Sequence, residues 1–135
     1  MKNYVLDSSA ILLYLRDAPD AGKVEKLFQQ SQETTAQLAI SAVNWAECRF
    51  ALMRQLGRVQ ADAALSAVAN DLLEIVPVDR VHAESAADLR TRFNGSLADS
   101  FAATLAIRRG ATLVTSDPEF EAIKKEVKIL RMQSR

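Results

Sequence analysis

Short runs of apolar residues alternate along this chain with longer segments in which apolar residues recur every three or four positions. The short runs predict buried β-strands, because a strand covered on both faces needs no polar side. We expect strands at residues 4–6, 38–40, 73–78, 112–115 and 127–130. The longer segments predict amphipathic helices, which we expect at about 10–17, around 24–28, at 43–56, 61–73, 80–93 and 97–109, and from 118 onward.

Strands separated by helices predict a parallel sheet that helices cover on both faces, since parallel neighbours need a long crossover connection. The sequence has 135 residues and shows no internal repeat, low-complexity tract or linker. We therefore expect a single α/β domain over residues 1–135, built on a parallel sheet of four to five strands.

Four acidic residues stand where this arrangement would bring them to one edge of the sheet. Asp7 and Asp117 follow closely on predicted strands, and Glu47 and Asp99 lie near the starts of predicted helices. The carboxyl ends of parallel strands and the starts of the helices after them share one edge, where ligands of open α/β sheets bind. We therefore expect the four carboxylates to converge there.

Each acid also has a simpler interpretation. Asp7 and Asp117 suit helix N-caps, and Asp99 suits the positive end of a helix dipole. We expect Glu47 on or beside the buried face of its helix, where its carboxylate needs a cation or hydrogen-bond donors as partners, and an arginine or a lysine is the simplest of these. The residues that we expect on that buried face are Val43, Ala46, Phe50 and Ala51.

A cluster of four carboxylates repels itself and must be neutralised. Two carboxylates about 4 Å apart repel by roughly 4 kcal/mol at an effective dielectric of 20. Protonation is one solution, and a hard divalent cation, Mg²⁺ or Mn²⁺, is the natural alternative for a set of oxygen ligands. Such an ion would bind a phosphodiester and lower the pKa of a bound water. The neighbouring hydroxyls, which would cap turns or bind phosphate oxygens, are Ser8, Ser9, Thr115 and Ser116.

Composition and charge narrow the function further. Seventeen Lys and Arg balance seventeen Asp and Glu, so an attraction to nucleic acid must come from a local patch or a bound cation. Cys48 and His82 are single residues of their kind, which excludes an intrachain disulfide, a structural zinc site and two-histidine nuclease chemistry. No apolar run reaches membrane-spanning length, so we expect a cytoplasmic protein without a membrane partner.

The segments around the four acids resemble the PIN-domain ribonucleases, and within that family the VapC-type toxins of prokaryotic toxin–antitoxin pairs. The similarity spans nearly the whole chain in four blocks, at residues 5–12, 41–47, 97–106 and 113–120. Asp7, Glu47, Asp99 and Asp117 stand in turn at the acidic positions of these blocks, and none of these positions is missing.

This resemblance implies a three-layer α/β/α sandwich and a metal-dependent endoribonuclease that cleaves RNA phosphodiester bonds. It implies Mg²⁺ as the cofactor, with Mn²⁺ as a substitute, held by the same four acids as catalytic residues. It also implies a homodimer and a small cognate antitoxin of VapB type, so that the protein would be a toxin that arrests growth or translation.

The arginines of the chain suit RNA phosphates, because a guanidinium donates two hydrogen bonds to one phosphate. The candidates for such contacts are Arg49, Arg54, Arg90, Arg92, Arg108 and Arg109.

Two other functions remain open from the sequence. A phosphatase or phospho-acceptor would also place an acid after the first strand. However, the haloacid-dehalogenase pattern needs a second acid where Ser9 stands, and a response regulator needs a lysine that the segment 115–120 lacks. A non-catalytic binding or scaffold module would use the acids only as caps and ion-pair partners, or to bind a metal without catalysis. A scaffold of caps and ion pairs predicts that Mn²⁺ leaves the melting temperature unchanged.

Overall fold

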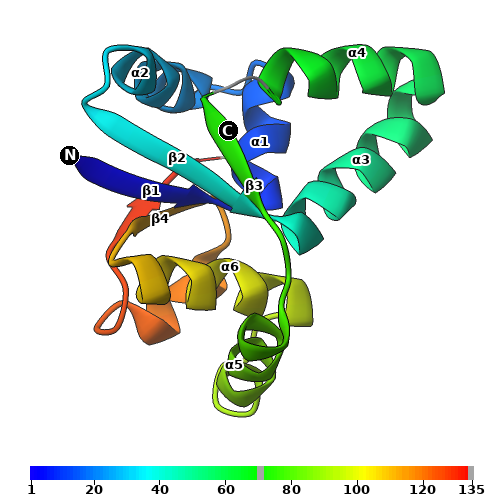
Figure 1. The fold of residues 1–135 in the computed structure, drawn as a ribbon. Coiled ribbons are helices and arrows are strands. Elements are labelled where there is room, and N and C mark those ends of the chain that lie inside the picture. The colour runs from blue at the N-terminus through cyan, green and yellow to red at the C-terminus, as the bar shows by residue number, and fades with distance from the viewer. Residues whose placement is uncertain (70–71, 134–135) are drawn as a thin grey trace.

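A five-stranded parallel sheet runs through the part of the chain that the computed structural model describes, residues 1–69 and 72–133 (Figure 1). The strands lie in the order β3-β2-β1-β4-β5, and every neighbouring pair is parallel. Their bounds are β1 Lys2–Leu6, β2 Ala36–Ser41, β3 Leu73–Val76, β4 Thr112–Thr115 and β5 Ile129–Arg131. The expected parallel sheet is therefore confirmed.

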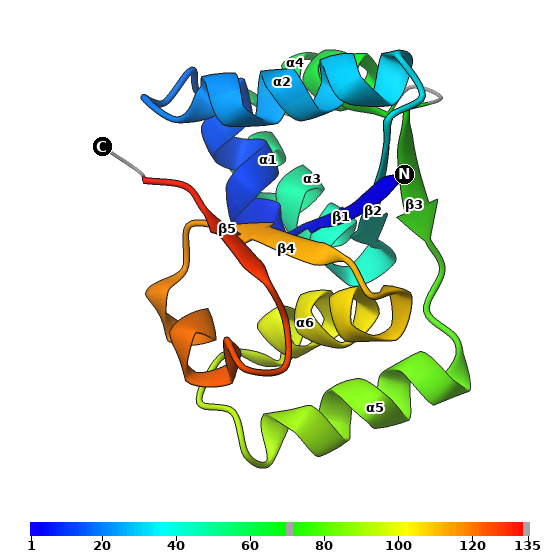
Figure 2. The same cartoon turned by 90° about the vertical axis from the view of Figure 1, so that its left-hand side faces the viewer.

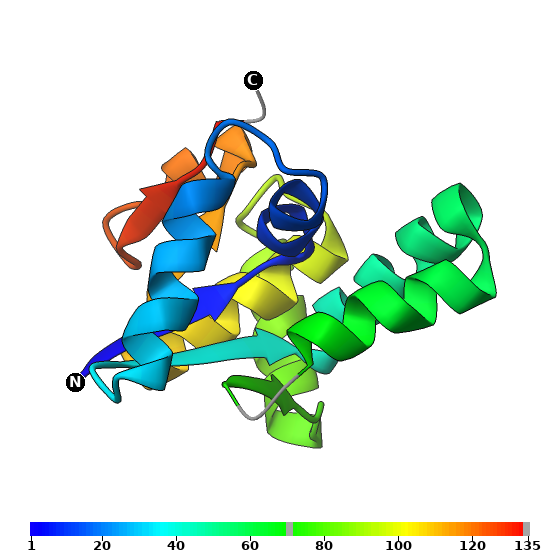
Figure 3. The ribbon, with the colours of Figure 1, turned by 90° about the horizontal axis from the view of Figure 1, so that it is seen from above.

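Helices cover both faces of this sheet, which gives the expected three layers (Figure 2). The α-helices are α1 Ser8–Leu15, α2 Ala21–Gln32, α3 Ala42–Leu56, α4 Arg58–Val68, α5 Arg80–Arg90 and α6 Leu97–Arg109, and η1 (Pro118–Ile123) is a 3₁₀ helix. Helices α1 to α4 lie over one face, and α5, α6 and η1 lie over the other. Helices α3 and α4 form a hairpin that projects from the rest of the molecule (Figure 3). No helix in the described residues is long and apolar enough to cross a membrane.

The alternation of side chains along the strands explains the two-sided core. Leu6 and Val114 point into the apolar cluster under α1 to α4, whereas Val5 and Leu113 point into the cluster under α6. Successive residues of a strand face opposite sides, so a short run of apolar residues contributes side chains to both apolar clusters. This is why the strands carry no polar face in the sequence.

Most element boundaries agree with the sequence to within a few residues. Helix α6 and strand β4 have the expected bounds, while the helix expected at 61–73 begins earlier, at Arg58, and ends at Val68. Part of that expected helix, residues 70–71, lies outside the described residues. The segment after Pro118 forms a 3₁₀ helix, with Asp117 as its cap.

The expected buried face of α3 is wrong. The buried residues of this helix are Asn44, Cys48 and Leu52, whereas Phe50 is 64% exposed and Glu47 is exposed too. Helix α3 carries apolar residues on more than one side, and its far end lies in the projecting hairpin (Figure 3). Apolar spacing therefore predicts the helix but does not determine which side faces the core.

The loop before α6 depends on the small size of Gly95. A β-carbon on Gly95 would lie 2.4 Å from two ring carbons of Phe93, and the buried Phe93 ring stacks on Phe120 at 5.4 Å. We expect Gly95→Ala to lower the free energy of unfolding by about 1–3 kcal/mol through overpacking, measured by urea denaturation. The control is Gly22→Ala in α2, where nothing lies within 4 Å of the new carbon. The control should keep or raise stability, because alanine favours a helix more than glycine does. An equal change in both variants would contradict this account.

Candidate active site at the carboxyl edge of the sheet

The chain reverses its direction of travel across the sheet between β1 and β4, and this is where the acids gather. From β1 the chain proceeds to β2 on one side, and β4 later fills the place on the other side. Leu6 pairs with Val114, so Asp7 and Thr115 are the next residues on the two strands. The backbone nitrogen of Asp7 donates to the Val114 carbonyl at 3.1 Å. Such a switch point is the usual ligand site of an open parallel sheet.

Asp7 is the most deeply buried of the four acids, with 2% of its surface exposed. Its Oδ1 accepts hydrogen bonds from the Ser9 hydroxyl at 2.7 Å and the Ala10 backbone nitrogen at 3.0 Å, and its Oδ2 accepts one from the Thr115 hydroxyl at 2.5 Å. The bond from Ala10 caps α1, so the capping interpretation is correct as local geometry. Burial raises the pKa of Asp7 to about 6, because the hydrogen bonds offset only part of the desolvation.

Asp117 lies close enough to Asp99 to raise the pKa of its carboxyl. Asp99 forms a capping box with Ser96: the Ser96 backbone nitrogen donates to Oδ2 of Asp99 at 3.1 Å, and the Ser96 hydroxyl accepts from the Asp99 nitrogen at 3.0 Å. The pKa of Asp99 rises to about 7, first through burial, and then through a hydrogen bond with Asp117 and the negative charges of Asp117 and Asp7. Asp117 itself caps η1, with Oδ1 accepting from the Glu119 nitrogen at 2.9 Å.

Glu47 is exposed and lies beside the buried residues of α3, not among them. Its Oε1 accepts from the Ser8 hydroxyl at 2.9 Å and from the Asn44 side-chain nitrogen at 3.3 Å. Ser8 directly follows Asp7, so these bonds connect Glu47 with the start of α1. The partners of Glu47 are therefore neutral donors, and neither an arginine nor a lysine neutralises it within the described residues.

The structure brings three of the four acids into electrostatic contact. Asp7 and Asp117 both raise the pKa of Asp99, while Glu47 is connected to them through Ser8. Within the described residues, no three His, Cys, Asp or Glu side chains are placed as they stand to hold a metal ion. The arrangement is thus a set of oxygen donors that repel one another, with Asp7 fixed and Glu47 at the open side.

Sequence reasoning missed part of what holds these acids. Ser9 and Thr115 were expected chiefly as turn and cap hydroxyls, yet both donate to Asp7. The Ser9 hydroxyl also accepts from the backbone nitrogen of Ser116 at 3.0 Å, which ties α1 to the loop after β4. Asn44 was not identified at all, although an amide three residues before an acid on a helix is placed to reach it.

Neither Cys48 nor His82 makes a hydrogen bond to these acids in the described residues. Cys48 is fully buried in the core under α1 to α4, and burial raises the pKa of its thiol to about 12. His82 packs edge-on against Phe101 on α6, with its Nε2 3.1 Å from the Phe101 carbonyl. The two side chains lie in different parts of the core, so they do not form the Cys–His pair of a hydrolase.

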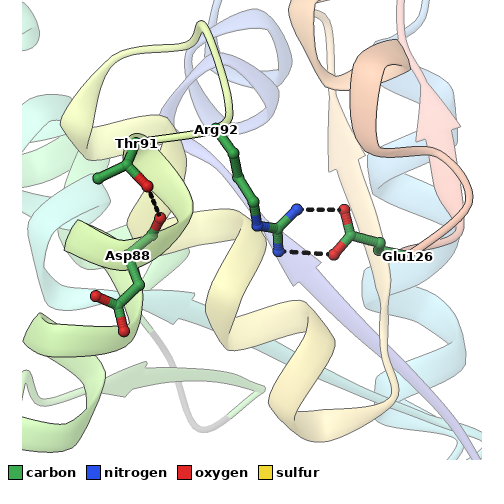
Figure 4. Close-up of polar contacts among 4 residues, drawn as sticks. All are labelled: Asp88, Thr91, Arg92 and Glu126. Carbon is green, nitrogen blue, oxygen red and sulfur yellow. Dashed lines mark hydrogen bonds and ion pairs between the residues drawn. The ribbon is translucent and has the colours of Figure 1, made fainter.

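Several arginines that suited phosphate binding are already paired with acids. Arg92 donates two hydrogen bonds of 2.7 Å to Glu126 next to the end of α5, where the Thr91 hydroxyl donates to the Asp88 carbonyl (Figure 4). Arg109 makes a similar bidentate pair with Glu74, and Arg49 pairs with Asp62.

Arg54, by contrast, has no acidic partner in the described part of the chain. Its guanidinium lies over the Phe50 ring, 5.6 Å from the ring centre. Arg54 therefore remains the best placed of these arginines on α3 for a phosphate.

Comparison with known proteins agrees with this fold and with the resemblance seen in the sequence. The chain is similar in structure to VapBC2 from Rickettsia felis, crystallised with a DNA fragment from its promoter (22% identity over 96% of this chain and 98% of that one, TM-score 0.78). It is also similar to VapC20 of Mycobacterium tuberculosis, described as a sarcin-ricin loop cleaving toxin (18%, 89% and 94%, 0.71), and to VapBC-5 of the same organism (26%, 98% and 100%, 0.66). Comparison with curated protein sequences gives no match. The model of the PIN domain family matches residues 4–126, and the chain therefore belongs to the PIN domain family.

Proposed function

We propose that this protein is a metal-dependent endoribonuclease and the toxin of a VapC-type toxin–antitoxin pair. The observation that carries the proposal is the group of mutually repelling carboxylates, Asp7, Asp99 and Asp117, at the switch point of the sheet. Burying like charges lowers stability unless the site has a cation to bind. Membership of the PIN domain family and the similarity to a toxin that cleaves the sarcin-ricin loop support RNA as the substrate.

Mg²⁺, with Mn²⁺ as a substitute, is the cofactor that fits these donors. All four proposed ligands and catalytic residues, Asp7, Glu47, Asp99 and Asp117, offer hard carboxylate oxygens, which suit these ions. Glu47 is exposed and Asp117 is half-buried, so both side chains have room to adjust around an ion, while Asp7 is held in place. When bound, the metal would polarise the phosphodiester and lower the pKa of the attacking water.

The residues of the chain supply orientation in this mechanism. The hydroxyls of Ser9 and Thr115 fix both oxygens of Asp7, so the carboxylate keeps one direction. The negative charges of Asp117 and Asp7 raise the pKa of Asp99, so the three carboxylates lie close enough to act together. With a metal ion bound, Asp99 and Asp117 would help Asp7 to hold it and would orient the attacking water.

The geometry disfavours the two other functions. Asp7 is 2% exposed and both its oxygens accept hydrogen bonds from protein donors, so it is a poor phosphate acceptor. A scaffold would gain nothing from burying Asp7 and Asp99 at raised pKa values, because this weakens folding at neutral pH.

A cognate VapB-like antitoxin and a homodimer are part of the same proposal. The similar structures include VapBC complexes, in which toxin and antitoxin are together. Three apolar side chains are exposed around the starts of α5 and α6, namely Val78, Val81 and Leu97, and they are available for such contacts. We place the protein in the cytoplasm, where its proposed RNA substrate lies.

Cleavage of cellular RNA tests the function directly. We expect the purified, antitoxin-free protein to produce discrete fragments with Mn²⁺ or Mg²⁺ and none with EDTA. Asp7→Asn and Asp99→Asn should each lower the rate at least about 100-fold, because each removes a charge that holds the metal. The control is Asp79→Asn, which changes an acid that caps α5 outside the cluster by accepting from the His82 nitrogen at 2.7 Å. Cleavage that persists in both cluster variants would refute the proposal.

The buried acids also predict how stability depends on pH in the metal-free protein. The pKa of Asp7 is about 6 in the folded protein and 3.8 as a free side chain, so the folded state holds its proton more tightly. The free energy of unfolding should therefore fall by about 1–2 kcal/mol as the pH rises from about 5 to 7.5. Asp99 acts in the same direction.

Thermal denaturation in EDTA measures this effect. Asp7→Asn should flatten the pH dependence, and Mn²⁺ at pH 7.5 should restore stability to the wild-type protein. Stability that rises with pH over this interval would contradict the assignment of Asp7 as a destabilised acid.

Arg54 should contribute to RNA binding more than the paired arginines. It lies seven residues, or two helical turns, beyond Glu47 on the same side of α3. We expect Arg54→Ala, in an Asp99→Asn background, to weaken RNA binding roughly 3- to 10-fold and to reduce the salt dependence. Arg92→Ala is the control, because Glu126 already occupies that guanidinium. Equal losses in both variants would exclude a specific role for Arg54.

A further inference from the structure

Asn44 on α3 is fully buried and only partly satisfied. Its side-chain nitrogen donates to Oε1 of Glu47 at 3.3 Å and to the Ala98 carbonyl at 3.2 Å, whereas its Oδ1 has no hydrogen-bond partner in the described residues. Both neighbours are acceptors, so the nitrogen and not the oxygen must face them. The orphaned oxygen is therefore a consequence of the contacts that the nitrogen makes.

The burial of the Asn44 amide is not explained by a gain in stability. Nearly all buried polar groups in proteins have a partner, and a buried carbonyl without one weakens folding. The two acceptors do not need the amide as a donor. The Ala98 carbonyl lies in α6 and accepts a backbone hydrogen bond of that helix, and the Glu47 carboxylate is exposed to water. A buried group that lowers stability and contacts a cluster of acids calls for a functional explanation.

The contacts of Asn44 close a chain of hydrogen bonds across the site. Ser8, which follows Asp7, donates to Glu47, and Asn44 donates both to Glu47 and to the carbonyl of Ala98, the residue before Asp99. The three elements that carry Asp7, Glu47 and Asp99 are thus connected. Both donors bind Oε1 of Glu47, and Oε2 has no hydrogen-bond partner in the described residues.

We propose that Asn44 is a positioning residue that holds the otherwise exposed Glu47 toward Asp99 across the contact between α3 and α6. The inference rests on the proposed nuclease function, in which Glu47 must meet the other acids. An exposed glutamate samples many rotamers, and fixing one oxygen restricts the direction of the other. Asn44 thereby connects Glu47 indirectly with the segment that carries Asp99.

Asn44→Leu separates positioning from a structural role, because leucine keeps the branched shape of the side chain, with a somewhat larger volume, and removes the amide. We expect an unchanged or higher melting temperature, a kcat lower by about 10- to 100-fold and a KM within about twofold of wild type. The matched control is Thr104→Val, which removes a buried hydroxyl of α6 that bonds only to its own helix. A lower melting temperature with normal kcat would overturn the proposal. Asn44→Ala serves the same comparison if the leucine variant does not fold.

A double-mutant cycle tests whether Asn44 acts through Glu47. In a Glu47→Gln background, Asn44→Leu should lower kcat by less than about twofold further, since the carboxylate it positions is already absent. A further tenfold loss would overturn the proposal, because Asn44 would then act through α6 alone.

The affinity for Mn²⁺, measured by calorimetry, keeps the test independent of cleavage. We expect Asn44→Leu to weaken Mn²⁺ binding by about tenfold and Thr104→Val to leave it unchanged. If the wild type binds Mn²⁺ but cleaves no RNA, the proposed substrate fails, and the Mn²⁺ affinity still decides the role of Asn44. If the acid variants lose cleavage but Asn44→Leu has wild-type kcat and affinity, the positioning role alone is overturned.

Discussion

The desolvated carboxylate of Asp7 between β1 and β4 is the constraint on which the rest of the site depends. Its two oxygens are held by Ser9, Ala10 and Thr115, so one side chain connects the start of α1 with the end of β4. That connection exists only because the two strands are adjacent and in register. A buried charge of this kind requires several good donors, and these come from residues that a shift of one position would turn to the other face of the sheet.

The same geometry that caps helices also assembles the acids. At the carboxyl edge of a parallel sheet, several helices begin side by side, and their free backbone nitrogens donate hydrogen bonds to acidic side chains. Asp7 and Asp117 cap α1 and η1, and Asp99 completes the capping box of α6 with Ser96. Capping and clustering are therefore not alternatives here. The capping hydrogen bonds offset part of the cost of burying these charges, and the raised pKa values of Asp7 and Asp99 reflect burial first and the neighbouring negative charges second.

The positions of Asp7, Asp99 and Asp117 could be predicted because each depends on a local signal, a strand end or a helix start, within a simple parallel topology. Glu47 and Asn44 could not be placed in the same way. Their environment depends on which side of α3 faces the molecule, and a helix with apolar residues on several sides does not specify this. The burial of Asn44 in particular depends on how α3 packs against α6, a tertiary contact that the sequence pattern does not encode.

The charge balance of the chain suggests a second role for the proposed metal ion, the attraction of the RNA phosphates. The chain is formally neutral, and several of its arginines are held by Glu74, Glu126 and Asp62. A cluster of acids beside an RNA backbone would repel it, and Arg54, which has no acidic partner in the described residues, lies two helical turns beyond Glu47. A divalent ion would change the sign of the local field at the point where a phosphate must approach. Binding of substrate and assembly of the acids would then depend on the same ion.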